Sequence, residues 1–164
     1  MSPLIISLST STLLCTLTAG IALTFATVVM PGIRRLDDLQ FLRAFKHMDG
    51  IIQNNQPIFM FVWVGSALAI LTSAIIGTIQ LEGWNRNLLV IAALLYLFGV
   101  QAPTVSVNVP LNNALQELDL ESLSPDEIQD TRTGFESRWN TWNIRRTIAA
   151  ILTALLLIVL LVRL

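Results

Sequence analysis

The stretch that decides the fold is PIFMFVWVGSALAILTSAIIGTIQ, residues 57–80, which contains no charged side chain. A run of about 20 mostly apolar residues is long enough to cross the hydrocarbon core of a membrane as an α-helix. Three further runs share this character, at about 4–30, 88–108 and 147–164. The four runs hold no Asp, Glu or Lys, and their one Arg, Arg163, can extend toward the membrane surface. The sequence therefore predicts four membrane-spanning helices.

The composition supports the same class of protein. Hydrophobic residues make up 54% of the 164 residues and charged residues 13%, whereas soluble domains contain about 25% charged residues. A chain this apolar cannot cover a water-facing surface, so we expect one transmembrane domain over residues 1–164. The net charge of −1 and the lack of a dense basic patch give no reason to expect a nucleic-acid partner.

The basic residues indicate an orientation in the membrane. Segments 31–56 and 109–146 contain every Lys and Arg except Arg86 and Arg163. Cytoplasmic loops carry the excess of Lys and Arg, so both long loops are predicted to be cytoplasmic and both termini to lie outside a plasma or inner membrane. The predicted fold class is an all-α integral membrane four-helix bundle.

The segment between the first two spans predicts an additional helix. Pro31–Gly32 predicts the end of the first span, and Asp37 or Asp38 is a suitable N-cap for a second, shorter helix. Apolar side chains then recur at helical spacing, at Phe41, Phe45, Met48 and Ile52. This pattern is typical of an amphipathic helix, which we expect at the cytoplasmic surface of the membrane.

Polar residues in the third span form a stripe. They stand at i, i+3, i+7 and i+11, at Gln101, Thr104, Asn108 and Asn112. Polar side chains inside a membrane usually face the bundle or a cavity. Two interpretations are open: interhelical hydrogen bonds alone, or the same bonds together with a functional cavity.

The fourth helix carries the polar residues on the complementary side. In RWNTWNIRRTIAA (138–150), one helical face collects Trp139, Trp142, Asn143, Arg146 and Thr147. The opposite face is aliphatic and is predicted to contact lipid. The topology brings the first face to the same depth as Asn55, Asn108 and Asn112. We therefore predict a polar pocket with an aromatic wall near the cytoplasmic interface.

The sequence lacks the common metal-binding, redox and dinucleotide-binding motifs. The sequence contains no HExxH, CxxC or GxGxxG pattern, and the carboxylates of 117–136 show no metal-ligand spacing. His47 is the only histidine and shares its face with Arg43 and Lys46. It is either exposed to solvent or headgroups, or a general base, since imidazole titrates near neutral pH. No metal site is predicted.

The stretches VSVNVPLNNAL (105–115), RWNTWNIRRTIAA (138–150) and PGIRRLDDLQFLRAFKHMDGIIQNNQPIF (31–59) resemble the anthrone oxygenase-like family of small four-helix membrane proteins. Characterised fungal members oxidise polyketide anthrones to anthraquinones with molecular oxygen and are regarded as needing no metal or flavin. Most other members have no assigned activity. The residues that match the family's motifs are Asn108, Pro110, Asn112, Trp139, Trp142, Asn143, Arg146 and Thr147.

This resemblance implies cofactor-independent oxidation of a hydrophobic aromatic, anthrone- or quinol-like substrate by molecular oxygen. Arg146, Asn108 and Asn143 would donate to the developing oxyanion, with His47 as the available imidazole base. The expected substrate-binding residues are Trp139, Trp142, Asn112, Asn55, Thr147 and Gln101.

The alternative is a non-enzymatic membrane protein that serves in assembly, as an accessory subunit or in lipid binding. The asparagines would then be interhelical bonds, and the Trp and Arg residues interfacial anchors. The partners expected across the two hypotheses are membrane lipid, a hydrophobic aromatic molecule and a second copy of the chain.

Overall fold

The computed structural model describes residues 2–164 and is helical almost throughout. Its elements are α1 (Pro3–Thr24), η1 (Phe25–Val29), α2 (Met30–Ile33), α3 (Asp38–Gln53), α4 (Pro57–Gln80), α5 (Gly83–Tyr96), η2 (Leu97–Gln101), η3 (Thr104–Asn108), α6 (Val109–Glu117) and α7 (Pro125–Arg163). The η segments are π-helical. Within residues 2–164, four continuous helices are long and apolar enough to cross a membrane: Pro3–Ile33, Pro57–Gln80, Gly83–Glu117 and Pro125–Arg163. The protein is an all-helical integral membrane protein.

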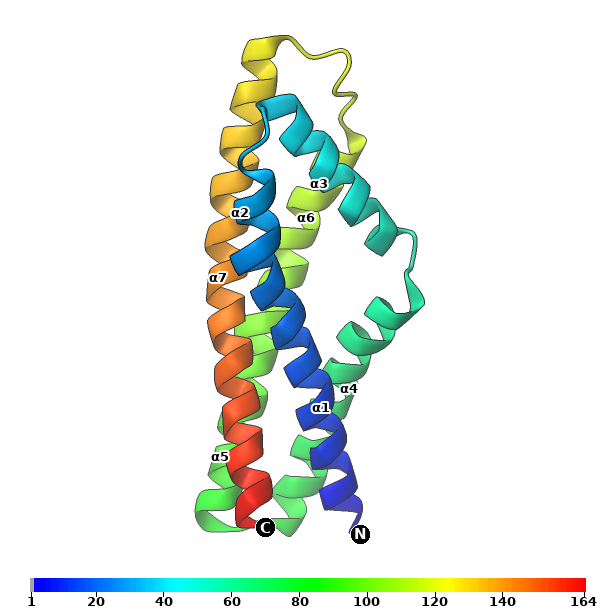
Figure 1. Ribbon diagram of the computed structural model, residues 1–164. Helices are drawn as coiled ribbons and strands as arrows, with labels where there is room; N and C mark the ends of the chain where they lie inside the picture. The colour runs from blue at the N-terminus through cyan, green and yellow to red at the C-terminus, as the bar shows by residue number, and fades with distance from the viewer. Residues whose placement is uncertain (1) are drawn as a thin grey trace.

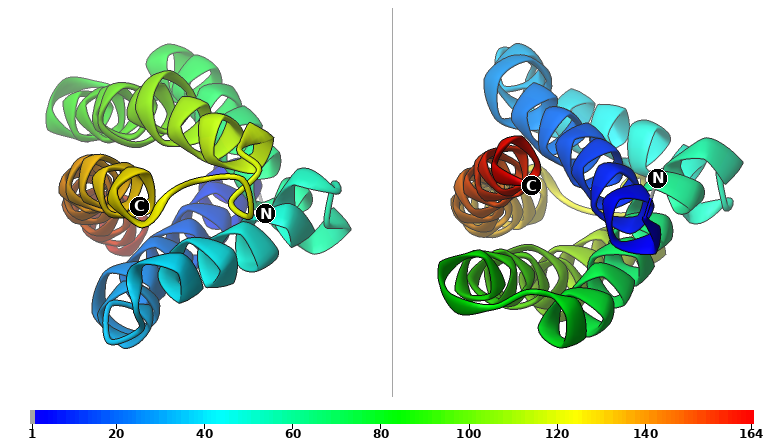
Figure 2. Two further views of the ribbon diagram at one scale, coloured as in Figure 1. Left: turned by 90° about the horizontal axis from the view of Figure 1, so that it is seen from above. Right: turned by 90° about the horizontal axis from the view of Figure 1, so that it is seen from below.

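The four long helices form an antiparallel bundle (Figure 1). α1 and α5 each pack against both α4 and α7, so the helices close into a ring when seen along the bundle (Figure 2). Both termini lie at one end with the short α4–α5 connection, and α3 lies near the other end (Figure 1). The N-terminal part of α4 tilts away from the bundle and joins α3 through a short connection (Figure 1). A cavity lined in part by residues of α3 and α4 is described below.

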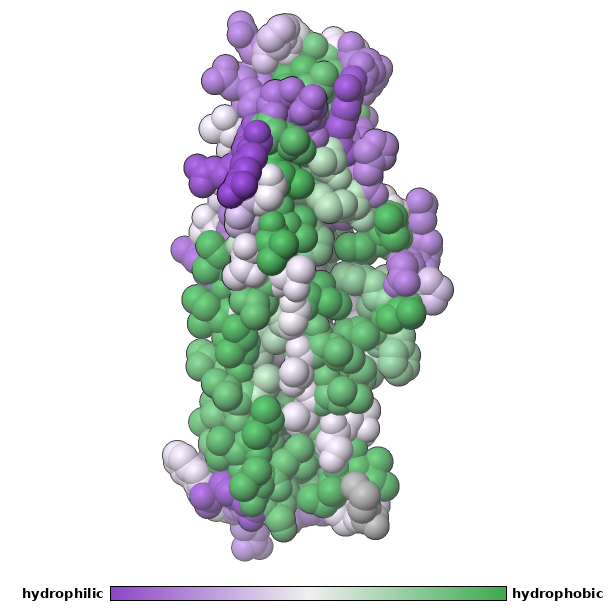
Figure 3. Space-filling model, viewed as in Figure 1, coloured by the Kyte–Doolittle hydropathy of each residue, from purple (hydrophilic) through white to green (hydrophobic). Residues whose placement is uncertain are grey.

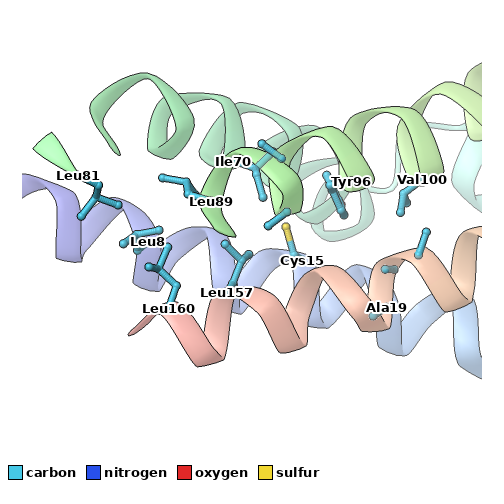
Figure 4. Close-up of a cluster of buried hydrophobic side chains, with 14 of the residues drawn as sticks. Leu8, Cys15, Ala19, Ile70, Leu81, Leu89, Tyr96, Val100, Leu157 and Leu160 are labelled. Carbon is cyan, nitrogen blue, oxygen red and sulfur yellow. The ribbon is translucent and has the colours of Figure 1, made fainter. Parts of the chain in front are cut away.

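The core of the bundle is apolar and closely packed. Figure 4 shows Leu8, Cys15, Leu89, Tyr96 and Leu157 converging between the helices, and all five are buried. A second cluster lies at the α3 end and includes Phe41, Phe45, Phe135 and Trp139. On the face seen in Figure 3, hydrophobic residues also cover the middle of the bundle between two more hydrophilic ends, as a lipid-facing surface requires.

Each π-helical segment ends two residues before a proline. η1 precedes Pro31, η2 precedes Pro103 and η3 precedes Pro110. Proline has no N–H to donate and its ring crowds the carbonyl four residues earlier. The wider π turn, which bonds each N–H five residues back, lets the helix pass the proline without ending. The prediction that Pro31–Gly32 ends the first helix is therefore wrong, because that helix continues to Ile33.

Helix starts agree with the sequence signals. Asp37 caps α3 by accepting from the backbone N–H of Gln40 at 2.8 Å. Ser124 and Glu127 form a capping box at the start of α7. α7 thus begins well before the apolar run 147–164, and its N-terminal half projects beyond that run.

The predicted amphipathic helix is present as α3, and its apolar face packs onto the bundle. The Phe45 ring lies 4.6 Å from the Phe135 ring and 5.4 Å from the Trp139 ring, measured between centroids. Phe41 is fully buried. α3 therefore covers one side of the bundle end, and its position at a cytoplasmic membrane surface stays a prediction.

Candidate functional site

A cavity of about 280 Å³ lies between α1, α3, α4, the third span and α7. Its volume is close to the lower end of small-molecule sites, which begin at about 300 Å³. Most of the lining is aromatic or aliphatic. The aromatic residues are Phe25, Phe45, Phe59, Trp63 and Trp139, and the polar residues include Asp49, Asn55, Thr104, Asn108, Asn112 and Arg146.

Five of the predicted site residues line this cavity: Asn55, Asn108, Asn112, Trp139 and Arg146. Asn55 sits in the α3–α4 connection with φ 58°, a left-handed conformation that Asn adopts more readily than most residues. Thr104, from the same predicted stripe as Asn108 and Asn112, joins them. Half of the predicted site residues thus line one cavity, and the roles assigned to them stay predictions.

Hydrogen bonds connect one end of the cavity lining into a chain. Asn112 Nδ2 donates to Asp49 Oδ1 at 2.7 Å, and Asn112 Oδ1 accepts from Trp139 Nε1 at 2.9 Å. The other carboxylate oxygen of Asp49 accepts from Gln53 and Gln116, at 2.8 and 3.0 Å. Asp49 is 3% exposed, so these donors replace the water it has lost.

Asn143 holds the Arg146 guanidinium in place. The Nε and Nη2 groups of Arg146 donate to Asn143 Oδ1 at 3.1 and 2.9 Å, and its Nη1 donates to Thr104 Oγ1 at 3.2 Å. Its Cζ lies 5.4 Å from the centroid of the Trp139 ring. In residues 2–164, no ion pair involves Arg146. The cavity wall therefore carries a fixed guanidinium without a carboxylate beside it, and only some of its donors are used.

Two polar atoms of the lining residues are buried and lack hydrogen-bond partners among residues 2–164: Trp63 Nε1 and Asn108 Oδ1. Asn108 is 2% exposed, and its Nδ2 donates to the Trp139 carbonyl oxygen at 3.4 Å. The carbonyl of Trp63 accepts from Gln101 at 3.4 Å. An unpaired buried polar atom costs free energy, so both atoms need an explanation.

The structure places five other predicted residues outside the cavity lining: Gln101, His47, Trp142, Asn143 and Thr147. Gln101 donates to the carbonyl oxygen of Trp63 and also to the Tyr96 hydroxyl, at 3.3 Å. Asn143 and Thr147 are buried within the bundle, where Thr147 donates to the Asn143 carbonyl at 2.7 Å. His47 is exposed on α3.

Trp142 lies on a different side of α7. Its ring is covered by Arg145, whose Cζ is 4.9 Å from the ring centroid. At about 100° per residue, Trp142 is about 60° from Trp139 on the side away from Asn143. The buried stripe of α7 runs through Trp139, Asn143, Thr147 and Ala150. Trp142 is thus at the edge of the protein-facing side, where it contacts the outward Arg145.

Sequence reasoning missed Asp49 and Trp63. Asp49 lies four residues after Phe45, so it falls in the middle of the apolar face of α3. A carboxylate in that position is a signal, because it is costly to bury without partners. Trp63 gave a weaker signal: it comes three residues before the buried Ser66 and shares that side of α4.

The arrangement can hold a flat hydrophobic molecule and can act on it with charge. The aromatic rings provide apolar area, while Asp49 can accept a proton and Arg146 can stabilise negative charge. Asp49 is the one Asp, Glu or His in the lining drawn from residues 2–164.

Comparison with known protein families identifies a relationship. A family model described as anthrone oxygenase matches residues 53–156. Comparisons with curated proteins and with solved structures gave no significant match. The matched range includes the cavity residues from Asn55 to Arg146, whereas Asp49 precedes it. The match covers more than half of the chain, which therefore belongs to the anthrone oxygenase family.

Proposed function

We propose that the protein is a membrane-embedded oxygenase that binds a hydrophobic aromatic, anthrone- or quinol-like substrate in the 280 Å³ cavity and oxidises it with molecular oxygen. The proposal includes no metal or flavin. The observation that carries it is that one carboxylate, Asp49, and one guanidinium, Arg146, line the same cavity, most of whose other lining residues are aromatic or aliphatic. Membership of the anthrone oxygenase family supports the same reaction class.

The reaction begins with the removal of a benzylic proton by Asp49. The substrate's negative charge spreads onto its ketone oxygen, where Arg146 donates hydrogen bonds to it. Asn143 positions Arg146 and does not itself touch the substrate, because it lies outside the lining. His47 is exposed and is not among the lining residues, so Asp49 replaces it as the base in this proposal.

The carbanion then reacts with oxygen directly. A carbon–oxygen bond forms, and the peroxide that results takes up a proton. Loss of the second benzylic proton breaks the O–O bond and expels water, which leaves a new ketone. For an anthrone the balance is anthrone plus O₂ giving anthraquinone plus H₂O: the carbon loses four electrons and oxygen gains four.

The test uses purified protein in nanodiscs with emodin anthrone and oxygen. We expect quinone formation and oxygen consumption above the no-protein rate. Arg146→Lys keeps the charge but loses the planar guanidinium that donates hydrogen bonds to Asn143 and Thr104. We therefore expect kcat/KM to fall about 10- to 100-fold, as for a weakened hydrogen bond to a charged group. Arg145→Lys is the matched control, since Arg145 faces outward on Trp142.

Two results would contradict the proposal. A rate equal to the no-protein rate removes the oxygenase function for this substrate, and the non-enzymatic role in ligand or lipid binding then takes its place. Equal effects of Arg145→Lys and Arg146→Lys would make Arg146 an anchor and not part of the site.

The orientation is also a proposal: the α3 end, which holds the cavity, faces the cytoplasm of a plasma or inner membrane, and both termini face outward. The support is the concentration of Lys and Arg at that end. A membrane-impermeant maleimide should label Ser122→Cys only in inside-out vesicles, because Ser122 is exposed in the α6–α7 connection. Labelling in right-side-out vesicles would reverse the orientation.

A further inference from the structure

An outward-facing line of residues along α7 changes from charged to aliphatic. A step of seven residues returns to within about 20° of the same direction on an α-helix. Arg138, Arg145, Leu152 and Val159 follow one another at this spacing, and all four are exposed. Leu152 and Val159 belong to the apolar part of a helix long enough to cross a membrane. The line therefore leaves the hydrocarbon region between Leu152 and Arg145.

The length of the apolar part places Arg145 at the membrane boundary. Arg163, at the other end of α7, lies about 27 Å from Arg145 along the axis at 1.5 Å per residue. This distance is close to the hydrocarbon thickness of about 30 Å. The one charged residue between them, Arg146, bonds to Asn143 and lines the internal cavity. Because long side chains on a helix lean toward its N-terminus, the Arg145 guanidinium stands among the lipid phosphates at the α3 end.

Neither of the two outward arginines is neutralised by the protein. Among residues 2–164, no ion pair involves Arg138 or Arg145. The Arg145 Cζ lies 4.9 Å from the Trp142 ring centroid, so the guanidinium is directed back along the helix toward Arg138. Both arginines border a shallow depression on α7 whose lining includes Ser137 and contains no Asp or Glu. The nearest acidic residue on this side of α7, Asp130, is about 12 Å from Arg138 along the axis.

We propose that this face of α7 binds an anionic phospholipid of the leaflet at the α3 end. The guanidinium groups of Arg138 and Arg145 bind its phosphate, and its acyl chains lie along Leu152 and Val159. The occupant is a lipid and not a free anion, because the arginines continue directly into an aliphatic line that only acyl chains can cover. None of these four residues lines the cavity, so this inference does not depend on the proposed oxygenase function.

The test measures lipid affinity by native mass spectrometry of the full chain in a neutral detergent. Dioleoyl phosphatidylglycerol is the anionic probe, and dioleoyl phosphatidylcholine, which has the same chains but no net charge, is the reference. Wild-type protein should bind phosphatidylglycerol at least about fivefold more tightly, since a basic residue near an anionic headgroup contributes about that factor. Arg138→Gln and Arg145→Gln should each weaken phosphatidylglycerol about fivefold, and phosphatidylcholine binding should not change.

Arg86→Gln is the matched control. Arg86 is also exposed and its loss changes the net charge equally, but it lies at the opposite end of the bundle (Figure 1) and follows Glu82 by four residues, so an acidic neighbour shares its face. This variant should bind phosphatidylglycerol as the wild type does. Because all three arginines are exposed, we expect all variants to fold, and thermal midpoints measured without added lipid check this.

Three results would overturn the proposal. The first is a wild-type protein that does not distinguish the two lipids. The second is a loss of affinity in Arg138→Gln and Arg145→Gln that is no larger than in Arg86→Gln. The third is displacement of phosphatidylglycerol by inorganic phosphate beyond the effect of sodium chloride at equal ionic strength, because the site would then take a free anion. Turnover of emodin anthrone is not needed for any of these measurements.

Discussion

Trp139 on α7 donates its indole N–H to Asn112 Oδ1 on α6 at 2.9 Å, and this bond turns the amide of Asn112 so that its nitrogen faces Asp49 on α3. One side chain thus connects three helices at the edge of the cavity. The indole can only donate and the carboxylate can only accept, so the orientation of the Asn112 amide is dictated by both neighbours.

This chain of bonds predicts that Asn112 is important for stability. Asn112→Ala leaves the indole N–H and one carboxylate oxygen of Asp49 without their partners, at about 1–3 kcal/mol for each buried group. We expect the thermal midpoint in detergent to fall well below that of the wild type. Asn54→Ala is the control, because Asn54 is exposed in the α3–α4 connection. Equal midpoints for the two variants would contradict the prediction.

The assignment of the base can be tested separately. Asp49→Asn keeps the size of the side chain but removes the carboxylate, so turnover of emodin anthrone should fall about 10²- to 10⁴-fold, the usual contribution of a general base. His47→Gln should retain near wild-type turnover, because His47 is exposed and outside the cavity lining. Emodin binding shows whether the Asp49→Asn site is still formed. A larger loss for His47→Gln would return the role to the histidine.

Apolar length and capping residues were sufficient to predict the helices. The charge-free run 57–80 coincides with α4, and Asp37 caps α3, which begins directly after it. Both signals are local, because they depend on transfer into a membrane and on bonds within one turn. The continuation of the first helix past Pro31 could not be predicted from such local signals. A proline signals a break, and whether a π turn absorbs it depends on the packing around it.

Only part of the site could be predicted, because helical phase is a local signal and the direction of some side chains depends on packing. Helical phase placed Asn108, Asn112, Trp139 and Arg146 together, since all four lie near the centre of a polar face. It failed for Trp142, which lies at the edge of such a face, where the contact with Arg145 decides its direction. Gln101 precedes the π segment η3, whose wider turn changes the phase that the regular stripe assumed.

Close packing of the third span on α7 gives another prediction. A Cβ at Gly99 would lie 2.8 Å from the Cβ of Ala149, and neither atom can rotate away. Gly99→Ala therefore forces the helices apart and should cost about 1–3 kcal/mol, the usual cost of overpacking. Gly134→Ala is the matched control within α7, because no atom lies within 4 Å of its added Cβ.

The control should change in the opposite direction. Ala is favoured over Gly inside a helix by about 0.5–1 kcal/mol, so Gly134→Ala should unfold at the same or a higher temperature than the wild type. The measurement is thermal unfolding of both variants in one detergent. If Gly99→Ala is as stable as Gly134→Ala, the two helices are not held at contact distance at this point.

The final prediction concerns Arg132, which holds the connection between α2 and α3 against α7. Its guanidinium donates to the carbonyl oxygens of Arg34 and Leu36, at 2.8 and 2.9 Å, and to Asp38 Oδ1 at 2.8 Å. Hydrogen bonds to charged groups contribute about 1.5–3 kcal/mol. Arg132→Gln should therefore release the connection and speed trypsin cleavage after Arg34. Arg138→Gln, on the exposed side of α7, should leave cleavage unchanged. Mass spectrometry of the fragments gives both rates, and equal rates would mean that the connection is held by the packing of α3 and not by Arg132.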